Sequence, residues 1–276
     1  MSFVINTNVS AMESLRHLNG CNLRYNRTIQ QLASGRRIVT SADDPAGIAI
    51  AEKMKKDIKS TYQALGNTNI AISMLQVLDG AQNTLSEYLI RLKELSIQSA
   101  TDTIHDRERG AIDVETQAIL KDIDRLANGT EFNGTKLLNR LGGTMDIQIG
   151  INHDSMGRKT LNMRDFNTTV GAIGLSGMSN KTRDGAHLAI NIVDDAIVKI
   201  NSARAHVGGL MNALEMTKNK LTVTAENASD SKGRIQDADF ARKTSNLARD
   251  GILKQTTISS LLNANTRSSL ALKLIG

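Results

Sequence analysis

The sequence has few of the residues that build compact enzyme cores and disulfide-bonded folds. Its 276 residues contain no tryptophan, one proline, one cysteine and only seven aromatic side chains, four Phe and three Tyr. So few aromatics disfavour a globule built around a ligand pocket, because aromatic side chains bury a large area each. A single cysteine excludes an intrachain disulfide and a multi-cysteine metal site. One proline suits long unbroken helices, since proline removes a donor and clashes inside a helix.

Targeting and membrane signals are also missing from the sequence. No window approaches the roughly 18 consecutive apolar residues of a transmembrane helix. The first 20 residues have no cation before Arg16 and no apolar stretch, so we do not expect a cleavable signal peptide. The net charge of +6 comes from scattered Lys and Arg without a basic block, which disfavours nucleic-acid binding. We therefore expect neither a membrane nor a nucleic-acid partner.

Helical periodicity dominates the N-terminal part of the chain. Residues on one helical stripe recur at steps of four and three, at Ala11, Leu15, Leu18, Asn22, Tyr25, Ile29 and Leu32. Gly35 then ends the pattern as a C-terminal glycine does. A second helix is predicted to begin at Pro45, with Asp44 as its cap, and to continue to about residue 100. At about 1.5 Å per residue, roughly 55 residues span about 80 Å, which is wider than a compact domain.

The middle of the chain changes character before helical periodicity returns. A shorter helix is predicted from Ile112 to Leu126, and residues 141–185 alternate at period two in places, which predicts short strands at Met145, Ile147, Ile149 and Ile151 and at Leu161 and Met163. Glycines at 171, 174 and 177 predict a loop with little regular structure. Heptad spacing then holds from Ala189 to Ala228, typical of a coiled-coil-like helix. Gly233 is expected to interrupt it before a last helix from about Ala238 to Leu274.

These patterns predict a mainly α fold. Only the first and last helices are suitable long partners for each other, so the chain is expected to double back with both termini at one end. The fold class is therefore a long antiparallel coiled-coil-like helical rod with a small β-hairpin region in the middle of the chain.

No catalytic, cofactor or metal site emerges from the sequence. His17 and Cys21 share a helix face but lack an orienting third group, so Cys21 is interpreted as a small buried thiol. Asp43 and Asp44 precede Pro45, which favours helix capping over paired catalytic carboxylates. Asp194 and Asp195 lie outside the heptad seam and are expected to face solvent. No metal-ligand spacing and no phosphate-binding glycine motif are present. We expect no enzyme activity and no cofactor.

Five ordered segments resemble bacterial flagellins. The strongest is LASGRRIVTSADDPAGIAIAEKM at residues 32–54, and the others are INTNVSAM (5–12), EFNGTKLL (131–138), SARAHVGGLMNALE (202–215) and the tail from RIQDADFARKTSNLARDGIL (234–253). Together they cover roughly the first 140 and the last 90 residues. The resemblance implies an inner-core domain of residues 1–44 and 233–276. It also implies an outer-tube helical domain of residues 45–232, with a short β/loop insert at about 141–185.

The function implied by this resemblance is that of a structural subunit which polymerises into the bacterial flagellar filament, the propeller for swimming. The implied location is extracellular, after type III export without a cleaved signal peptide. Implied partners are copies of the chain, the flagellar cap, the hook–filament junction proteins, an export chaperone and the type III export gate. The alternatives are a hook–filament junction protein or a minor flagellin that co-assembles with another flagellin. A flagellin-related protease and a signalling coiled coil fit the sequence less well.

The resemblance also implies two sets of site residues. Self-assembly of the inner core is assigned to apolar residues of the terminal helices: Leu15, Leu18, Ile29, Leu32, Leu247, Ile252, Leu261, Leu262, Leu270 and Leu272. Contact with Toll-like receptor 5, an innate immune receptor, is assigned by motif to Leu89, Arg91, Leu95 and Glu115. Ile90 stands where the motif usually has Gln, which removes an amide able to donate and accept hydrogen bonds. For the leucines, a purely structural role in the core is the favoured interpretation.

Overall fold

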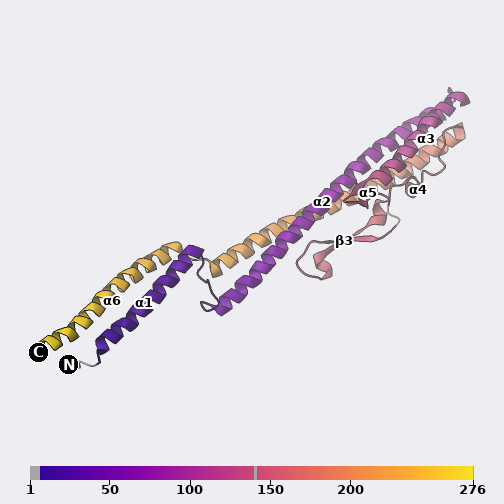
Figure 1. The fold of residues 1–276 in the computed structure, drawn as a ribbon. Coiled ribbons are helices and arrows are strands. Elements are labelled where there is room, and N and C mark those ends of the chain that lie inside the picture. Colours follow the sequence, from indigo (N-terminus) through magenta and orange to yellow (C-terminus); the bar gives the residue numbers. More distant parts are fainter. Residues whose placement is uncertain (1–6, 140–141, 276) are drawn as a thin grey trace. The chain divides into compact units, whose positions relative to one another are not determined.

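The chain is mainly helical, as predicted. The computed structural model describes residues 7–139 and 142–275, except for the side chains of residues 155 and 267–275. Its helices, in chain order, are α1 (Val9–Ser34), α2 (Pro45–Ala100), α3 (Asp106–Gly129), the short α4 (Val170–Ile173), α5 (Arg183–Gln236) and α6 (Phe240–Ile275). Figure 1 shows these elements coloured along the sequence. Among the described residues, none of the helices combines the length and the hydrophobicity of a membrane-spanning segment.

The chain divides into two compact units. The terminal unit comprises Met1–Ile58 and Glu226–Gly276, and the central unit comprises Lys59–Ala225. Helices α2 and α5 each contribute residues to both units, because the divisions fall inside these helices. The predicted limit after residue 44 coincides with the start of α2, whereas the predicted limit after residue 232 falls inside the last turns of α5. Those limits remain a prediction about how the chain is organised in an assembly.

Local sequence signals explain where the helices of the terminal unit begin and end. The Asn8 side chain caps α1 by accepting a hydrogen bond from the Ala11 amide at 3.0 Å. Gly35 ends α1 with φ of 67°, a left-handed conformation that glycine adopts without strain. Asp44 accepts from the Gly47 amide at 2.9 Å, so its predicted capping of α2 is confirmed. Pro45 is the first residue of α2, where a missing N–H has no cost.

The predicted interruption of α5 at Gly233 was wrong. Helix α5 continues through Gly233 to Gln236. A glycine inside a helix costs only about 1 kcal/mol relative to alanine, which neighbouring contacts can offset. The helix ends where its C-terminal carbonyls find partners outside the helix, since the Arg37 amide donates to the Gln236 carbonyl at 2.7 Å.

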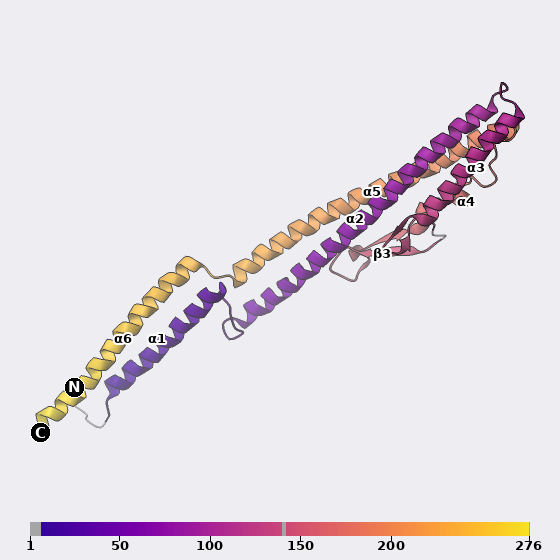
Figure 2. The ribbon, with the colours of Figure 1, turned by 45° about the horizontal axis from the view of Figure 1, so that its top comes forward.

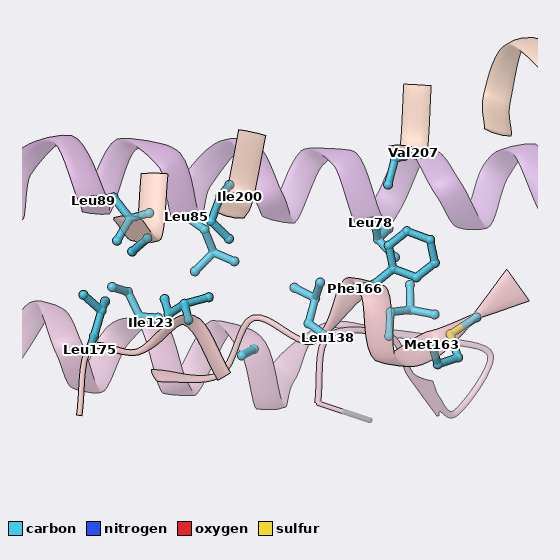
Figure 3. Packing of buried hydrophobic residues seen from close by; sticks show 14 of the residues in the cluster. Leu78, Leu85, Leu89, Ile123, Leu138, Met163, Phe166, Leu175, Ile200 and Val207 are labelled. Atoms are coloured by element: carbon cyan, nitrogen blue, oxygen red, sulfur yellow. The ribbon is translucent and has the colours of Figure 1, made fainter. Parts of the chain in front are cut away.

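The core of the central unit is one cluster of apolar side chains from α2, α3, α5 and the segment between α3 and α5. Leucines at 75, 78, 85, 89, 92 and 95 of α2 are 0–1% exposed. Opposite them lie α5 residues at heptad spacing, including Val193, Ala196, Ile200 and Val207. Figure 3 shows Leu138, Met163, Phe166 and Leu175 of the intervening segment closing the same cluster. The segment between α3 and α5 is thus anchored on the helices by its own apolar side chains.

The described residues form two small antiparallel sheets, of which only the second lies in the predicted β region of residues 141–185. Strands β1 (Glu131–Phe132) and β2 (Thr135–Lys136) meet at a tight turn, in which Asn133 and Gly134 have φ of 48° and 74°. Strands β3 (Thr144–Gln148) and β4 (Arg158–Asn162) pair with Met145 opposite Leu161.

Two details of the predicted strands were wrong, and one predicted loop contains a short helix. Ile149 and Ile151 lie beyond β3 in the connection to β4, where the Ile149 and Gly150 amides both donate to the Gly157 carbonyl and end the ladder. Met163 begins a short 3-10 helix, Met163–Phe166, which the Asn162 side chain caps. The region around Gly171 is also more regular than predicted, because Thr169 caps the one-turn helix α4 and Gly174 ends it with φ of 91°.

Candidate functional site

The candidate site is the helix pair of the terminal unit, α1 and α6, which pack along each other (Figures 1 and 2). The two helices are antiparallel, since Asn8, Ser14, Arg24 and Gln31 contact residues 264, 260, 250 and 243 in that order. The predicted pairing of the first and last long helices is therefore confirmed.

The interface between α1 and α6 is polar. The buried residues of the two helices, as far as their side chains are described, are Cys21, Thr28 and Gln31 on α1 and Asp250 and Ala264 on α6. Polar groups link the helices along their length. Asn8 Nδ2 donates to the Ala264 carbonyl at 2.9 Å, and Lys243 Nζ donates to Gln31 Oε1 at 2.5 Å. Such bonds fix the register of the pair but add little net stability, because each replaces bonds to water.

Asp250 is a buried carboxylate in this interface. Asp250 is 3% exposed, and Arg24 Nε lies 3.8 Å from Asp250 Oδ1. This oxygen accepts no hydrogen bond within the described part of the chain. A buried charge with one distant partner costs free energy, so this position specifies the alignment of the helices more than it stabilises them.

Large apolar side chains instead lie on the outer faces of the pair. The exposed members on α1 are Val9, Met12, Leu15, Leu23 and Ile29. The exposed members on α6 are Phe240, Ile252, Leu253, Ile258 and Leu262. Their exposed fractions range from 39% for Ile258 to 72% for Leu23. We call these ten side chains the outer apolar set. A two-helix unit with polar residues inside and apolar residues outside resembles one part of a larger core.

The residues assigned to self-assembly divide between the two environments. Leu15, Ile29, Ile252 and Leu262 belong to the outer apolar set. The half-buried ones are Leu18, Leu32, Leu247 and Leu261. The side chains of Leu270 and Leu272 lie outside the described residues. Six members of the set had not been singled out: Val9, Met12, Leu23, Phe240, Leu253 and Ile258. A second apolar stripe beside the first was the signal that could have identified them.

Beside this pair, residues 35–44 and 236–239 form a tightly bonded joint within the terminal unit. Arg36 and Asp237 form an antiparallel bridge, and the Ala238 amide donates to the Gly35 carbonyl at 3.0 Å. Asp43 Oδ2 accepts from the Val39 and Thr40 amides, both at 3.0 Å, and Arg27 Nη2 lies 2.6 Å from its Oδ1. Hydrogen bonds from these two amides, together with the charge of Arg27, lower the pKa of Asp43 below its usual value of 3.8.

The residues assigned to receptor contact lie in the central unit, in two environments. Leu89 and Leu95 are 0% and 1% exposed and belong to the apolar core. Arg91 is exposed and lies between two carboxylates, with its Nη2 2.8 Å from Glu115 Oε1 and its Nη1 3.1 Å from Glu94 Oε2. Hydrogen bonds to Glu115 and then Glu94 raise the pKa of the Arg91 guanidinium above its usual value. The structure thus brings Arg91 and Glu115 together on the surface.

The other residues considered as catalytic or metal-binding candidates have ordinary roles in packing or on the surface. Cys21 is 5% exposed and accepts a hydrogen bond from Arg24 Nη2 at 3.2 Å, which confirms the predicted buried thiol. His17 lies 3.9 Å from Glu13 and is exposed. Asp195 is exposed as expected, whereas half-exposed Asp194 forms an ion pair with Lys93. Within the described ranges, no three His, Cys, Asp or Glu residues are grouped so that they could hold a metal ion.

Comparison with known proteins gives a consistent result along the chain. Residues 5–142 match the bacterial flagellin N-terminal helical region, and residues 190–275 match the bacterial flagellin C-terminal helical region. Flagellin FlaB1 of Treponema pallidum is 32% identical over 290 aligned positions, which cover 99% of both chains. A flagellar filament core protein of Brachyspira hyodysenteriae is 33% identical with the same coverage. The crystal structure of Bacillus cereus flagellin matches with a TM-score of 0.50 and 28% identity, over 60% of this chain and 94% of that one.

Proposed function

The chain belongs to the bacterial flagellin family and is a structural subunit of the flagellar filament, and from this premise we propose how its terminal unit drives assembly. The observation that carries the proposal is the outer apolar set on α1 and α6. Ten large apolar side chains face away from a polar seam, where they are in contact with water in the single chain. Copies of the same unit, packed side by side, would remove them from water.

Energetics favour assembly over a stable isolated helix pair. A helix gains most of its stability from burying an apolar face, and the α1–α6 seam buries mainly polar groups. Each large apolar side chain that moves from water into an interface contributes about 1.5–3 kcal/mol. Several such side chains per copy exceed the cost of association, whereas a lone pair of helices remains marginal. Copies related by a rotation that does not close then form an open helical fibre.

Within this proposal the apolar residues have two roles. Leu15, Ile29, Ile252 and Leu262 contact neighbouring copies, because they are exposed in the single chain. Leu18, Leu32, Leu247 and Leu261 are half-buried in the single chain, so we assign them to contacts both within the chain and between copies. Leu270 and Leu272 are assigned to the same assembly surface from the sequence alone. The structural role requires neither a cofactor nor enzyme activity.

Membership of the family places the protein at the bacterial flagellum. The further proposal is that the chain reaches the outside by type III export, without cleavage of a signal peptide. An export chaperone would cover the apolar face of α6 before assembly, since an exposed stripe of this kind promotes premature association. The flagellar cap and the hook–filament junction proteins would contact the ends of the polymer. Nothing in the comparisons favours the junction protein or a minor flagellin over a filament subunit.

The assembly proposal is tested by deleting the last 20 residues. We expect the truncated chain to remain soluble and to fail to polymerise on filament fragments, because it loses the C-terminal part of α6, including Ile258 and Leu262. Sedimentation after seeding measures the polymerised fraction, with the full-length chain in parallel. Filaments formed by the truncated chain at the normal concentration would refute the assigned role of α6.

A second proposed interaction is with Toll-like receptor 5, through exposed Arg91 and Glu115. Their ion pair presents a charged group on the surface of the central unit, while Leu89 and Leu95 support α2 from the core. We expect Arg91→Ala to reduce the signal in a receptor reporter assay, because the arginine is exposed and its loss leaves the core intact. Arg107→Ala, a change at another exposed arginine of the same unit, is the control. Equal signals from wild type and Arg91→Ala would remove Arg91 from the contact.

A further inference from the structure

The net charge of the chain is confined to one of its two units. The terminal unit has 16 Lys and Arg and 10 Asp and Glu residues, a difference of +6. The central unit has 18 of each and is neutral. The whole net charge of +6 therefore lies on the unit that, by the proposed function, packs against copies of itself.

Pairing between copies cannot remove this charge. Each additional copy brings six more cations than carboxylates, so any arrangement of terminal units retains a net charge of +6 per copy. The central unit supplies no compensating charge, because it is neutral. Like charges packed at close distance repel, and only anions from solution can neutralise them.

The terminal unit contains a cavity suited to such an anion. Between α1, α6 and the joint lies a hollow of about 590 Å³, lined by six arginines, one lysine and five aspartates. Arg242, Asn246 and Arg249 line it from α6 at spacings of four and three, which place them on one face of the helix. A guanidinium presents donors in a fixed fork that matches an oxyanion.

Four of the five aspartates in the cavity already have partners. Asp43 is held by Arg27 and two backbone amides, and Asp250 lies beside Arg24. Asp44 caps α2, and the Asp239 side chain accepts from the Arg242 backbone amide at 3.1 Å.

The cations on the α6 side are not matched in the same way. Arg242 and Arg249 form no ion pair within the described residues, and Lys243 contacts the uncharged amide oxygen of Gln31. Counted over the whole lining, Asp237 included, seven cations face five carboxylates, so the cavity has a net charge of +2. Arg242, Arg249 and Lys243 are the cations of the α6 wall without a carboxylate partner in the described structure.

We propose that this cavity binds a multivalent oxyanion, such as sulfate or phosphate, between Arg242 and Arg249. The bound anion neutralises part of the charge that accumulates when terminal units pack together. Assembly is then linked to anion concentration, because each subunit added to the fibre takes up anion. This inference rests on the proposed filament function, but the binding site itself can be tested without assembly.

The experiment compares sulfate with chloride at equal ionic strength. The full-length chain is seeded with filament fragments, and the monomer left after sedimentation gives the critical concentration. Three chains are compared: wild type, Arg242→Gln/Arg249→Gln, and the control Lys121→Gln/Lys220→Gln. The control removes two exposed cations of the central unit that form no ion pair in the described structure, so both double variants have a net charge of +4.

We expect sulfate to lower the critical concentration of wild type and of the control about tenfold relative to chloride, the effect of one charge-assisted contact. Arg242→Gln/Arg249→Gln should show little preference between the anions. General salting-out by sulfate acts on all three chains equally, so an equal sulfate effect in all three overturns the proposal. So does the absence of any sulfate preference in wild type.

Equilibrium dialysis against labelled sulfate tests anion binding separately from filament assembly. Wild-type chain should bind sulfate more tightly than Arg242→Gln/Arg249→Gln, and equal binding would overturn the site. If wild type forms no filament in either salt, the proposed function fails, while the dialysis comparison still decides whether the cavity binds sulfate.

Discussion

Gln82 is a residue whose burial works against the stability of the central unit. It is 0% exposed, and neither its Nε2 nor its Oε1 has a hydrogen-bond partner in the described structure. Leu78 and Leu85 are its buried neighbours on α2. An unsatisfied buried amide costs about 1–3 kcal/mol, which an apolar group of similar size would avoid. The amide is therefore a local defect in an otherwise apolar cluster.

Gln82→Leu is expected to raise the free energy of unfolding by about 1–2 kcal/mol, because it removes this unsatisfied amide while keeping the volume filled. Urea unfolding of the full-length monomer, followed by far-UV circular dichroism, measures the change. Gln82→Ala is the control, since it removes the same amide but leaves a cavity, and it should not stabilise. A lower unfolding midpoint for Gln82→Leu would contradict this account of the core.

Asp43 makes the terminal unit sensitive to acid. Its pKa in the folded chain lies below the usual 3.8, because the Thr40 and Val39 amides and Arg27 favour its charged form. A carboxyl with a lowered folded-state pKa contributes stability that is fully present above the unfolded value and is lost as the pH falls through the folded value. The contribution of Asp43 is therefore complete at pH 7, begins to fall near pH 4 and is lost as the pH drops through its lower folded-state pKa.

Filaments of Asp43→Asn should dissociate more readily than wild type at pH 7 and differ less from it at the acid end. Light scattering of filaments between pH 2 and pH 7 follows the dissociation. Asp195→Asn changes an exposed carboxyl on α5 and should behave as wild type. Identical acid transitions and equal stability at pH 7 for Asp43→Asn would show that the joint does not depend on this carboxylate.

At the scale of the helices, the two faces of α6 have separate tasks. One face carries Asp250 and Lys243 against α1, and the other presents Ile252 and Leu262. Ile252 is 68% exposed, so a polar substitution there leaves the seam intact. The residue therefore tests assembly separately from the folding of the helix pair.

Ile252→Asp is expected to raise the critical concentration for seeded polymerisation at least about tenfold. The apolar burial lost is about 1.5–3 kcal/mol per subunit, and 1.4 kcal/mol corresponds to a factor of ten. Gln255→Asp, at an exposed polar position one turn further along α6, adds the same charge and should have a smaller effect. Equal effects of the two substitutions would indicate general charge sensitivity and not loss of an apolar contact.

For the whole molecule, the long helices could be predicted because their periodicity and caps are local signals. The limits of α2 follow from Pro45 and from an apolar stripe that continues to residue 100. The coiled-coil-like part of α5 was predicted from its heptad spacing. The predicted break at Gly233 was wrong because helix propensity is a local property and does not include the hydrogen bond from the Arg37 amide to the end of α5.

The polar seam could not be predicted from the sequence. Thr28, Gln31 and Asp250 are buried because their faces of α1 and α6 meet. Apolar periodicity alone predicts the opposite, namely that the leucines of each helix face the partner helix. In this unit part of each stripe is exposed, which fits the proposal that neighbouring copies complete the core. The same limit applies to Arg91 and Glu115, two residues 24 positions apart in sequence whose ion pair joins α2 and α3.

The most direct test of the central claim is a helical reconstruction by electron microscopy of filaments grown from the purified chain on filament seeds. We predict long tubes in which Leu15, Ile29, Ile252 and Leu262 lie against neighbouring copies, while Gln31 and Asp250 remain within the α1–α6 seam of each subunit. Tubes in which these apolar side chains face solvent, or a folded chain that forms no tubes on the seeds, would contradict the account.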